Sequence, residues 1–363
     1  MKKLVLLVLA IFFFVALIGV LNNGNIGPSV LVAQHKGQDL TSTEIRSEDL
    51  TLFKPLPEVI PSEANPLTED KIALGRMLYY DTRLSKDKTI SCNTCHELDK
   101  YGVDHEVHST GVKGQRGTRN SPTVYNAAGH VAQFWDGRAP DVEAQAKGPV
   151  LNPVEMAMPD EKAVVMVLKS VPEYVVAFKK AFPADKDPVT YDNMGKAIGA
   201  FERKLVTASR WDKYLKGDKA ALTNVEKIGF NKYLETGCQM CHAGPYVGGS
   251  LFTKLGMAKE WPDKSDLGRF TVTRNDADKM KFKVPSLRNI EKTGPYYHNG
   301  SVSTLEKAVT LMAEYQLGKQ LGNDEVKSIT AWLKTLTGEI PADYIRPPVL
   351  PMSANPAASA GMF

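Results

Sequence analysis

The same five-residue pattern, C-x-x-C-H, occurs twice in this chain, within ISCNTCH at residues 90–96 and within TGCQMCH at residues 236–242. Two cysteines at this spacing can form thioethers with both vinyl groups of one porphyrin, and the adjacent histidine then lies beneath the iron as its proximal ligand. The pattern therefore predicts two covalent haems of the c type, with His96 and His242 as axial ligands. All four cysteines are then used for haem attachment, which leaves none for a disulfide: Cys92, Cys95, Cys238 and Cys241.

Two other chemistries use cysteine pairs at this spacing. A C-x-x-C redox pair gives no reason for a histidine directly after the second cysteine, and here that histidine occurs twice. A four-cysteine zinc site would have to join pairs from opposite halves of the chain and would leave both histidines incidental. Haem attachment is the interpretation that uses every residue of the motif.

Around these motifs the chain has the pattern of helices separated by long loops. Several residues mark helix N-termini, as single caps or as capping boxes ahead of apolar residues at helical spacing: Thr68; Asp160; Thr190; Thr223 with Glu226; and Ser303 with Glu306. Three long stretches between the helices are rich in glycine and proline: 101–123, 136–160 and 243–300. Loops of this length are uncommon in a compact domain unless something orders them, and two large flat cofactors would do so.

We therefore predict a mainly α fold of two cytochrome c-like domains, each built around one covalent haem, with long loops. The first domain is expected at residues 67–205 and the second at 206–336. A C-terminal tail, 337–350, is expected to pack on the first domain. Residues 34–66 are polar and contain proline, and we expect them to form a poorly ordered lead-in segment.

The N-terminus predicts export from the cytoplasm. Lys2 and Lys3 precede an uncharged, apolar run at residues 4–21, which is the pattern of a secretory signal and is nearly long enough for a membrane anchor. We assign residues 1–33 to one or the other, with the folded part in the periplasm or otherwise outside the cytoplasm. The formal net charge is +4, with acids and bases interspersed, so nucleic acid is not an expected partner.

Met312 is a candidate sixth ligand for the second iron. It shares a helical face with Leu305, Ala308 and Val309 at positions i, i+3, i+4 and i+7, so it is expected to point inward. A buried methionine is more often core filler than a metal ligand, and spacing alone leaves both interpretations open.

Several long segments resemble the bacterial dihaem cytochrome c peroxidases, within the superfamily that also contains MauG. The resemblance runs from about Leu67 to Leu336 and rests on these segments: LGRMLYYDTRLS, ISCNTCH, RNSPTVYNA, QFWDGRAPDVEAQAKGPVLNPVEM, GCQMCH, FKVPSLRNI, TGPYYHNGSVSTLEKAV and MAEYQLG. It implies that the first haem is the peroxidatic site. The second haem, with Met312 as its axial ligand opposite histidine, would receive the electrons.

The resemblance also implies roles for further residues. Glu155 matches the family's catalytic glutamate, a general base and then acid for peroxide, and Gln145 matches its pocket glutamine. Trp135 matches the tryptophan that lies between the haems and relays electrons. A calcium ion held by oxygen ligands is expected at the positions that match the family's site: Asn120, Thr293 and Pro295. His298 belongs to the family signature and is expected near the second haem, whereas His130 matches no family role.

One position departs from the family pattern. Many members carry a histidine on the loop after the first C-x-x-C-H, and this histidine blocks the peroxidatic iron until the second haem is reduced. The register from RNSPTVYN puts Val112 there, and valine cannot bind iron. We therefore expect an open first haem that needs no reductive activation. His105 and His108 lie in the same loop and would replace the missing ligand only if the loop folds differently.

Three functions follow from this pattern. The first is reduction of hydrogen peroxide to water, with electrons from a small c-type cytochrome or copper protein. The second is a MauG-like oxidation of a partner protein; loss of the blocking histidine favours it, but Met312 opposes it, because MauG has a tyrosine ligand there. The third is a dihaem electron carrier without peroxide chemistry. The resemblance also implies that the chain forms a homodimer.

Overall fold

The computed structural model describes residues 42–352. The apolar run at residues 4–21, on which the prediction of a signal or anchor rests, lies outside this range. Within the described range, no helix has the length and apolar character needed to cross a membrane.

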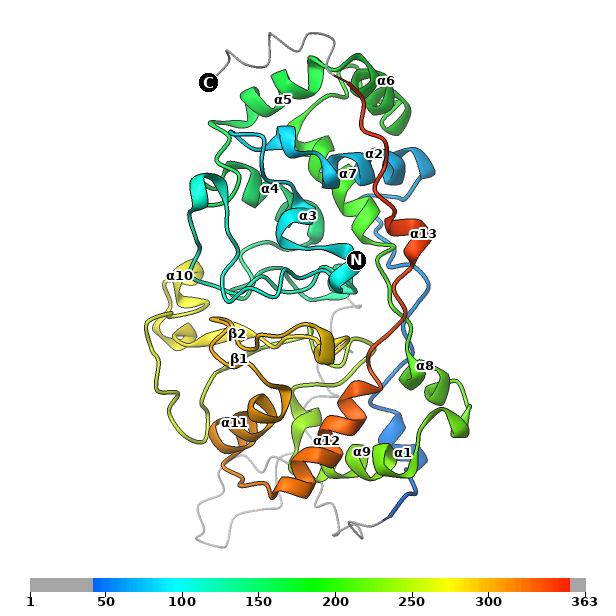
Figure 1. Ribbon diagram of the computed structural model, residues 1–363, viewed down its shortest axis with the longest axis vertical. Coiled ribbons are helices and arrows are strands. Elements are labelled where there is room, and N and C mark those ends of the chain that lie inside the picture. Colours follow the sequence, from blue (N-terminus) through cyan, green and yellow to red (C-terminus); the bar gives the residue numbers. More distant parts are fainter. Residues whose placement is uncertain (1–41, 353–363) are drawn as a thin grey trace, which may run out of the picture. The chain divides into compact units, whose positions relative to one another are not determined.

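The described chain is mainly helical, and its first half forms one group of helices (Figure 1). The bounds of these helices are α2 (Glu69–Tyr80), α4 (Val142–Leu151), α5 (Glu161–Lys169), α6 (Pro172–Ala181) and α7 (Tyr191–Glu202). Their apolar faces share one buried cluster that extends from Ile72 to Leu205. The short helix α3 (Cys92–Cys95), which carries the first motif, packs against this cluster through Cys92.

The second half forms a separate group with its own buried cluster, in which Trp211, Phe230 and Trp332 pack together. The bounds of its helices are α8 (Arg210–Leu215), α9 (Asn224–Thr236), α11 (Leu305–Leu317) and α12 (Asn323–Lys334). The division of the chain into haem domains at 67–205 and 206–336 stays a prediction, and these two clusters support it. The fold class, mainly α with long loops, is as predicted.

Each group contains the same close helix crossing. A Cβ on Gly75 of α2 would lie 1.9 Å from the carbonyl oxygen of Ala197 in α7. In the second group, a Cβ on Gly229 of α9 would lie 1.8 Å from the carbonyl oxygen of Ser328 in α12. Any side chain would force these helices apart, so glycine is required at both crossings. In both groups the crossing places a helix just ahead of the C-x-x-C-H motif.

Loops and a short antiparallel sheet lie between the two groups of helices (Figure 1). The sheet pairs β1 (Phe252–Lys254) with β2 (Lys281–Lys283), and Phe252 faces Lys283 in the register. The short helix α10 (Phe270–Thr273) belongs to the loop between these strands.

The two ends of the described chain pack against these groups. Helix α13 (Ala342–Ile345) lies on the first group, where the Tyr344 ring stacks on Phe201 at 5.1 Å. The lead-in carries helix α1 (Ser47–Leu50), and its neighbours Ile45 and Phe53 are buried in the second cluster. The described part of the lead-in is thus ordered by two apolar anchors, although its composition is polar.

The helix caps agree with the sequence in four of the five cases. Thr68, Asp160 and Thr190 cap α2, α5 and α7, and the Thr223 box starts α9. The predicted box at Ser303 is wrong by one residue, because Thr304 is the N-cap of α11 and its hydroxyl accepts a hydrogen bond from the backbone N–H of Lys307. Ser303 and Thr304 are adjacent residues with side-chain hydroxyls, so the local sequence does not distinguish the two as N-caps.

Candidate active site

Both motifs open into one large cavity that lies between the two groups of helices. The cavity wall includes every predicted haem-binding residue: Cys92, Cys95, His96, Cys238, Cys241, His242 and Met312. It also includes the other predicted site residues: Glu155, Gln145, Trp135, Asn120, Thr293 and Pro295. The fold thus brings together all of the predicted haem-binding, catalytic, relay and calcium residues, from both halves of the chain.

The first motif is held by the helix that precedes it. The Tyr79 hydroxyl, near the end of α2, donates a hydrogen bond to the carbonyl oxygen of His96 at 2.8 Å. His96 Nδ1 lies 3.3 Å from the carbonyl oxygen of Gly102, which leaves Nε2 free to bind a metal. Burial lowers the pKa of His96, so the imidazole is neutral, the form that binds iron.

The second motif repeats this arrangement. Helix α9 ends at Thr236, and the next residue, Gly237, has a φ of 97°, which only glycine adopts readily; Cys238 follows at once. The Tyr233 hydroxyl donates a hydrogen bond to the carbonyl oxygen of His242, as Tyr79 does for His96. Burial lowers the pKa of His242 to about 4, which keeps this imidazole neutral as well.

The four thiols fit thioether attachment better than a thiolate metal site. All four are unbridged, and burial raises their pKa values, to about 11 for Cys95 and about 12 for Cys238. Thiols in such surroundings resist the ionisation that zinc binding requires. In addition, residues 42–352 contain no group of three His, Cys, Asp or Glu side chains that could hold a metal ion. The donor set therefore fits two haems.

Glu155 and Gln145 line the cavity together with the first motif. Gln145 lies in α4, and Glu155 follows that helix in a tight turn, where the Asn152 amide donates to Glu155 Oε1 at 2.8 Å. Burial raises the pKa of the Glu155 carboxyl, although the positive charge of Arg138 and the bond from Asn152 oppose this shift. A carboxyl with a raised pKa, hydrogen-bonded but accessible from the cavity, can both accept and donate a proton.

A small hairpin at residues 110–116 braces this turn. The Val112 N–H donates to the carbonyl oxygen of Glu155 at 2.8 Å, and Gln115 Nε2 donates to the carbonyl oxygen of Pro153 at 3.1 Å. Gly111 packs so closely that a Cβ there would lie 2.1 Å from the carbonyl oxygen of Val154. The Val112 side chain is 2 % exposed and belongs to the first apolar cluster. The hairpin thus fixes the backbone that carries Glu155.

The two loop histidines lie apart from the cavity wall. Among the described residues that line the cavity, neither His105 nor His108 occurs, although Ser109 does. His105 is exposed, and its Nδ1 lies 3.1 Å from the carbonyl oxygen of Gly294. His108 Nε2 is buried and makes no hydrogen bond within the described chain.

Met312 lies on α11 and lines the same cavity as His242. Leu305, Ala308 and Val309, which share its helical face, line the same wall. The inward direction predicted from the spacing is therefore correct.

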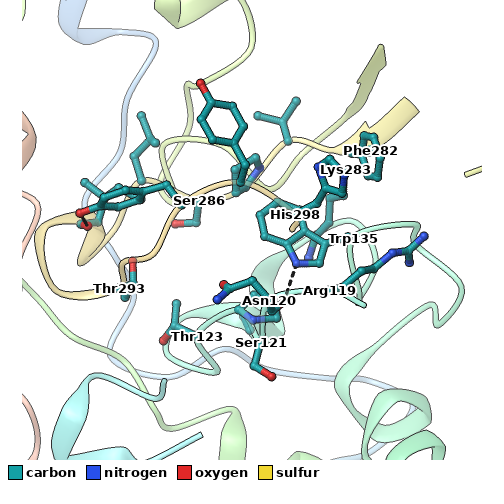
Figure 2. A pocket seen from close by; sticks show the side chains of 18 of the residues that line it. Arg119, Asn120, Ser121, Thr123, Trp135, Phe282, Lys283, Ser286, Thr293 and His298 are labelled. Atoms are coloured by element: carbon teal, nitrogen blue, oxygen red, sulfur yellow. Dashed lines mark hydrogen bonds between the residues drawn. The ribbon is translucent and has the colours of Figure 1, made fainter. Parts of the chain in front are cut away.

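Trp135 connects the two halves of the site (Figure 2). Its Nε1 donates to the carbonyl oxygen of Asn120 at 2.9 Å, and its ring meets His298 edge-on at a centroid distance of 6.5 Å. His298 in turn stacks on Phe282 of β2 at 4.2 Å. The backbone N–H of Asn120 donates to the carbonyl oxygen of His298 at 2.8 Å, so the same residues join a first-half loop to a second-half loop.

An ion-pair network that the sequence analysis missed holds these loops together. Arg119 lies beside Asn120 and contacts Asp136 at 2.6 Å and Asp266 at 2.6 Å, so one guanidinium binds carboxylates from both halves of the chain. The repeated motif tyrosines were also missed. The sequence does contain a signal for them. In each half of the chain a glycine lies four residues before the tyrosine, as Gly75 does before Tyr79 and Gly229 before Tyr233.

The fold and the cavity define a class of protein, a c-type cytochrome with two haem sites in one chain. Within that class, the chain belongs to the dihaem cytochrome c peroxidase family. The profile of this family, described as di-haem cytochrome c peroxidase, matches residues 69–220. Family membership makes the chain a haem peroxidase with two haem cofactors.

Relatives along most of the chain carry this assignment. The cytochrome c551 peroxidase of Pseudomonas aeruginosa is 45% identical and is matched over 84% of this chain and 89% of its own length. The cytochrome c551 peroxidase of Nitrosomonas europaea is 48% identical, over 84% and 88% of the two chains. A solved MauG-like protein associated with microbial copper homeostasis has the same fold, with a TM-score of 0.70, 29% identity and coverage of 81% and 97%.

Proposed function

We propose that this chain reduces hydrogen peroxide to water at the first haem, with electrons that arrive through the second. Hydrogen peroxide, two electrons and two protons give two molecules of water. The single observation that carries the proposal is the position of Glu155, a cavity carboxyl with a raised pKa beside the first C-x-x-C-H motif. An electron carrier without peroxide chemistry would have no use for such a group.

The chain's own residues would manage the protons. The iron, when haem is bound, supplies the site that binds peroxide and gives up electrons. Glu155, as a carboxylate, would accept a proton from the peroxide oxygen near the iron and return it to the departing oxygen. Gln145, on the same cavity wall, would orient the peroxide by hydrogen bonding. The Asn152 amide holds Glu155 Oε1, so the second carboxyl oxygen is the one left for this exchange.

Electrons would enter at the second haem and cross through Trp135. Met312 and His242 would hold the second haem, and a methionine–histidine pair would give its iron a high potential, as suits a receiver and store of electrons. Trp135 lines the cavity between the two motifs and is fixed by its bond to Asn120. The donor we propose is a small c-type cytochrome or a copper protein, outside the cytoplasm. We also propose a calcium ion held by oxygen atoms of Asn120, Thr293 and Pro295, which belong to the same cavity wall.

We further propose that the first haem is open at rest. Val112 holds the position of the family's blocking histidine and is buried away from the cavity, and the two loop histidines are not in the cavity wall that the described residues form. These positions support a first iron that no histidine of this loop blocks before the second haem is reduced.

Steady-state peroxide turnover will test the open site. Enzyme started fully ferric should show the same initial rate, without a lag, as enzyme started half-reduced. The donor must be too slow to reduce the second haem during the initial phase. Activity that develops only after half-reduction would mean that a ligand still blocks the iron, and replacement of His108 would then be the next experiment.

The hairpin brace gives a second test. Gly111→Ala should lower kcat/KM for peroxide by up to about 10²-fold, because its Cβ would push the hairpin off the Glu155 backbone and misplace the carboxyl. The matched control is Gly322→Ala, at an exposed position outside the cavity wall, since a Cβ there would make only an ordinary contact, at 3.6 Å from Glu325 Oε2. Equal activity of the two variants, at equal haem content, would show that the brace does not position Glu155.

A MauG-like oxidation of a partner protein remains the second candidate, because Val112 leaves the first haem open. The same turnover assay separates the two functions. A peroxidase consumes peroxide in proportion to the amount of small donor that is oxidised. A MauG-like enzyme consumes peroxide only when a partner protein is present to be modified.

A further inference from the structure

Lys283 is a buried cation in the wall of the haem cavity. It is the last residue of β2, and only 7 % of its surface is exposed. It lines the cavity near Trp135 and His298 (Figure 2). Its side chain makes one polar contact within the described chain, where Nζ lies 3.3 Å from Nδ1 of His130. Neither the catalytic proposal nor the family resemblance gives Lys283 or His130 a role.

His130 serves as a neutral support for the ammonium group. Burial and the positive charge of Lys283 hold the pKa of His130 well below its ordinary value. The neutral ring therefore accepts a hydrogen bond from Lys283 at Nδ1 and carries its proton on Nε2, which is enclosed beside Gly249 without a partner. The pair contains one positive charge and no negative one.

The three other buried Lys or Arg side chains of the described chain all have carboxylate partners. Arg288 contacts Asp212 at 2.7 Å, and Arg203 contacts Glu143 at 2.7 Å. Lys232, as buried as Lys283, contacts Glu235 at 2.7 Å and Glu325 at 2.9 Å. Within residues 42–352, no carboxylate lies within ion-pair distance of Lys283, and burial lowers its pKa to about 8. A buried ammonium requires an anion or loses its proton.

We propose that Lys283, supported by His130, binds a propionate carboxylate of a haem in this cavity. This inference rests on the haem assignment and not on the peroxidase reaction. A c-type haem is fixed by its vinyl groups at the cysteines, so its two propionates extend away from them as carboxylates inside the cavity. Lys283 is the cation in the described wall that lacks a carboxylate partner from the protein, and a propionate carboxylate would supply the negative charge.

The contact would tune the redox chemistry of the haem that it binds. A positive charge held beside a propionate offsets the carboxylate's negative charge, which otherwise favours ferric over ferrous iron. The pair therefore raises the reduction potential of that haem. Lys283 is in this sense a binding and positioning residue, not a catalytic one.

The test compares Lys283→Met with Lys283→Arg in the haem-loaded protein, by spectroelectrochemical titration and by resonance Raman spectroscopy of the propionate bending modes. Lys283→Met should lower the potential of one haem and shift its propionate band, while Lys283→Arg keeps both near the parent values. The matched control is Lys281→Met in the same strand, because Lys281 pairs with Asp278 at its surface. Both readouts are made without peroxide, so a failed peroxidase proposal would leave them unaffected.

Unchanged potentials and Raman bands in Lys283→Met would overturn the proposal. So would a potential that depends on added chloride in the parent but not in Lys283→Met, because the site would then hold a small anion from solvent. If Lys283→Met takes up too little haem to be measured, Lys283→Gln decides instead. Its amide can still donate to His130 Nδ1 but carries no charge, so this variant should also lower the potential and shift the propionate band, and parent values for both would overturn the proposal.

Discussion

Replacement of Glu155 by glutamine is expected to lower kcat/KM for hydrogen peroxide by about 10²–10⁴-fold, the range that a positioned general acid–base group contributes. Glutamine keeps the size of the side chain and can still contact Asn152, but it cannot exchange a proton with peroxide. The variant should therefore retain both haems and the binding of simple ligands such as cyanide at the first. Stopped-flow measurement of the peroxide reaction would separate this loss from any change in the supply of electrons.

The pH dependence gives Glu155 a signature of its own. Burial raises its pKa, so the carboxylate that accepts the first proton is lost at a higher pH than for an exposed glutamate. The kcat/KM of the parent enzyme should decline as pH falls through this raised pKa, and Glu155→Gln should not show this decline. Glu161→Gln, at an exposed position in the first turn of α5, is the matched control and should keep both the rate and the decline at low pH. Retention of full activity in Glu155→Gln would assign proton transfer to another group.

The sequence pointed to the residues with proposed chemical roles more readily than to the contacts that position them. A C-x-x-C-H motif is local, since its cysteines and histidine bind one porphyrin within five residues, and so both haem sites could be read directly. Met312 could be placed on an inward helical face because its neighbours have helical spacing. Catalytic roles for Glu155 and Gln145 could be proposed only by resemblance, since nothing in the local sequence separates a catalytic carboxylate from one in solvent.

The contacts that position these residues depend on packing between distant segments. Gly111 looks like an ordinary loop glycine until the hairpin meets the Glu155 turn, about 40 residues further along the chain. Lys283 looks like one charged residue among many, and its isolation from carboxylates is a property of the folded cavity. Ile45 and Phe53 lie in a polar segment whose composition hides the two anchors. A single sequence without pairing information does not contain these long-range contacts in readable form.

Replacement of Met312 tests the route by which electrons reach the site. Met312→His should lower the potential of the second haem by about a few tenths of a volt, within the roughly 0.8 V that axial ligands span, because imidazole stabilises ferric iron more than a thioether does. A donor that reduces the parent should then fail to reduce this haem, and turnover with that donor should fall by more than about tenfold. The peroxide reaction of the first haem, measured in the ferric enzyme, should be unaffected.

Two further variants decide whether Met312 is a ligand or only fills the core. Met312→Leu keeps the apolar volume on the same wall as Leu305 and Val309 but has no sulfur. If Met312 is the ligand, this variant loses the methionine-to-iron charge-transfer band of the ferric second haem, whereas Met257→Leu at an exposed position keeps it. If Met312→Leu instead keeps both the band and the potential of the parent, Met312 is core filler. The second iron must then be closed by another group, and the high-potential role proposed for it would have no ligand to sustain it.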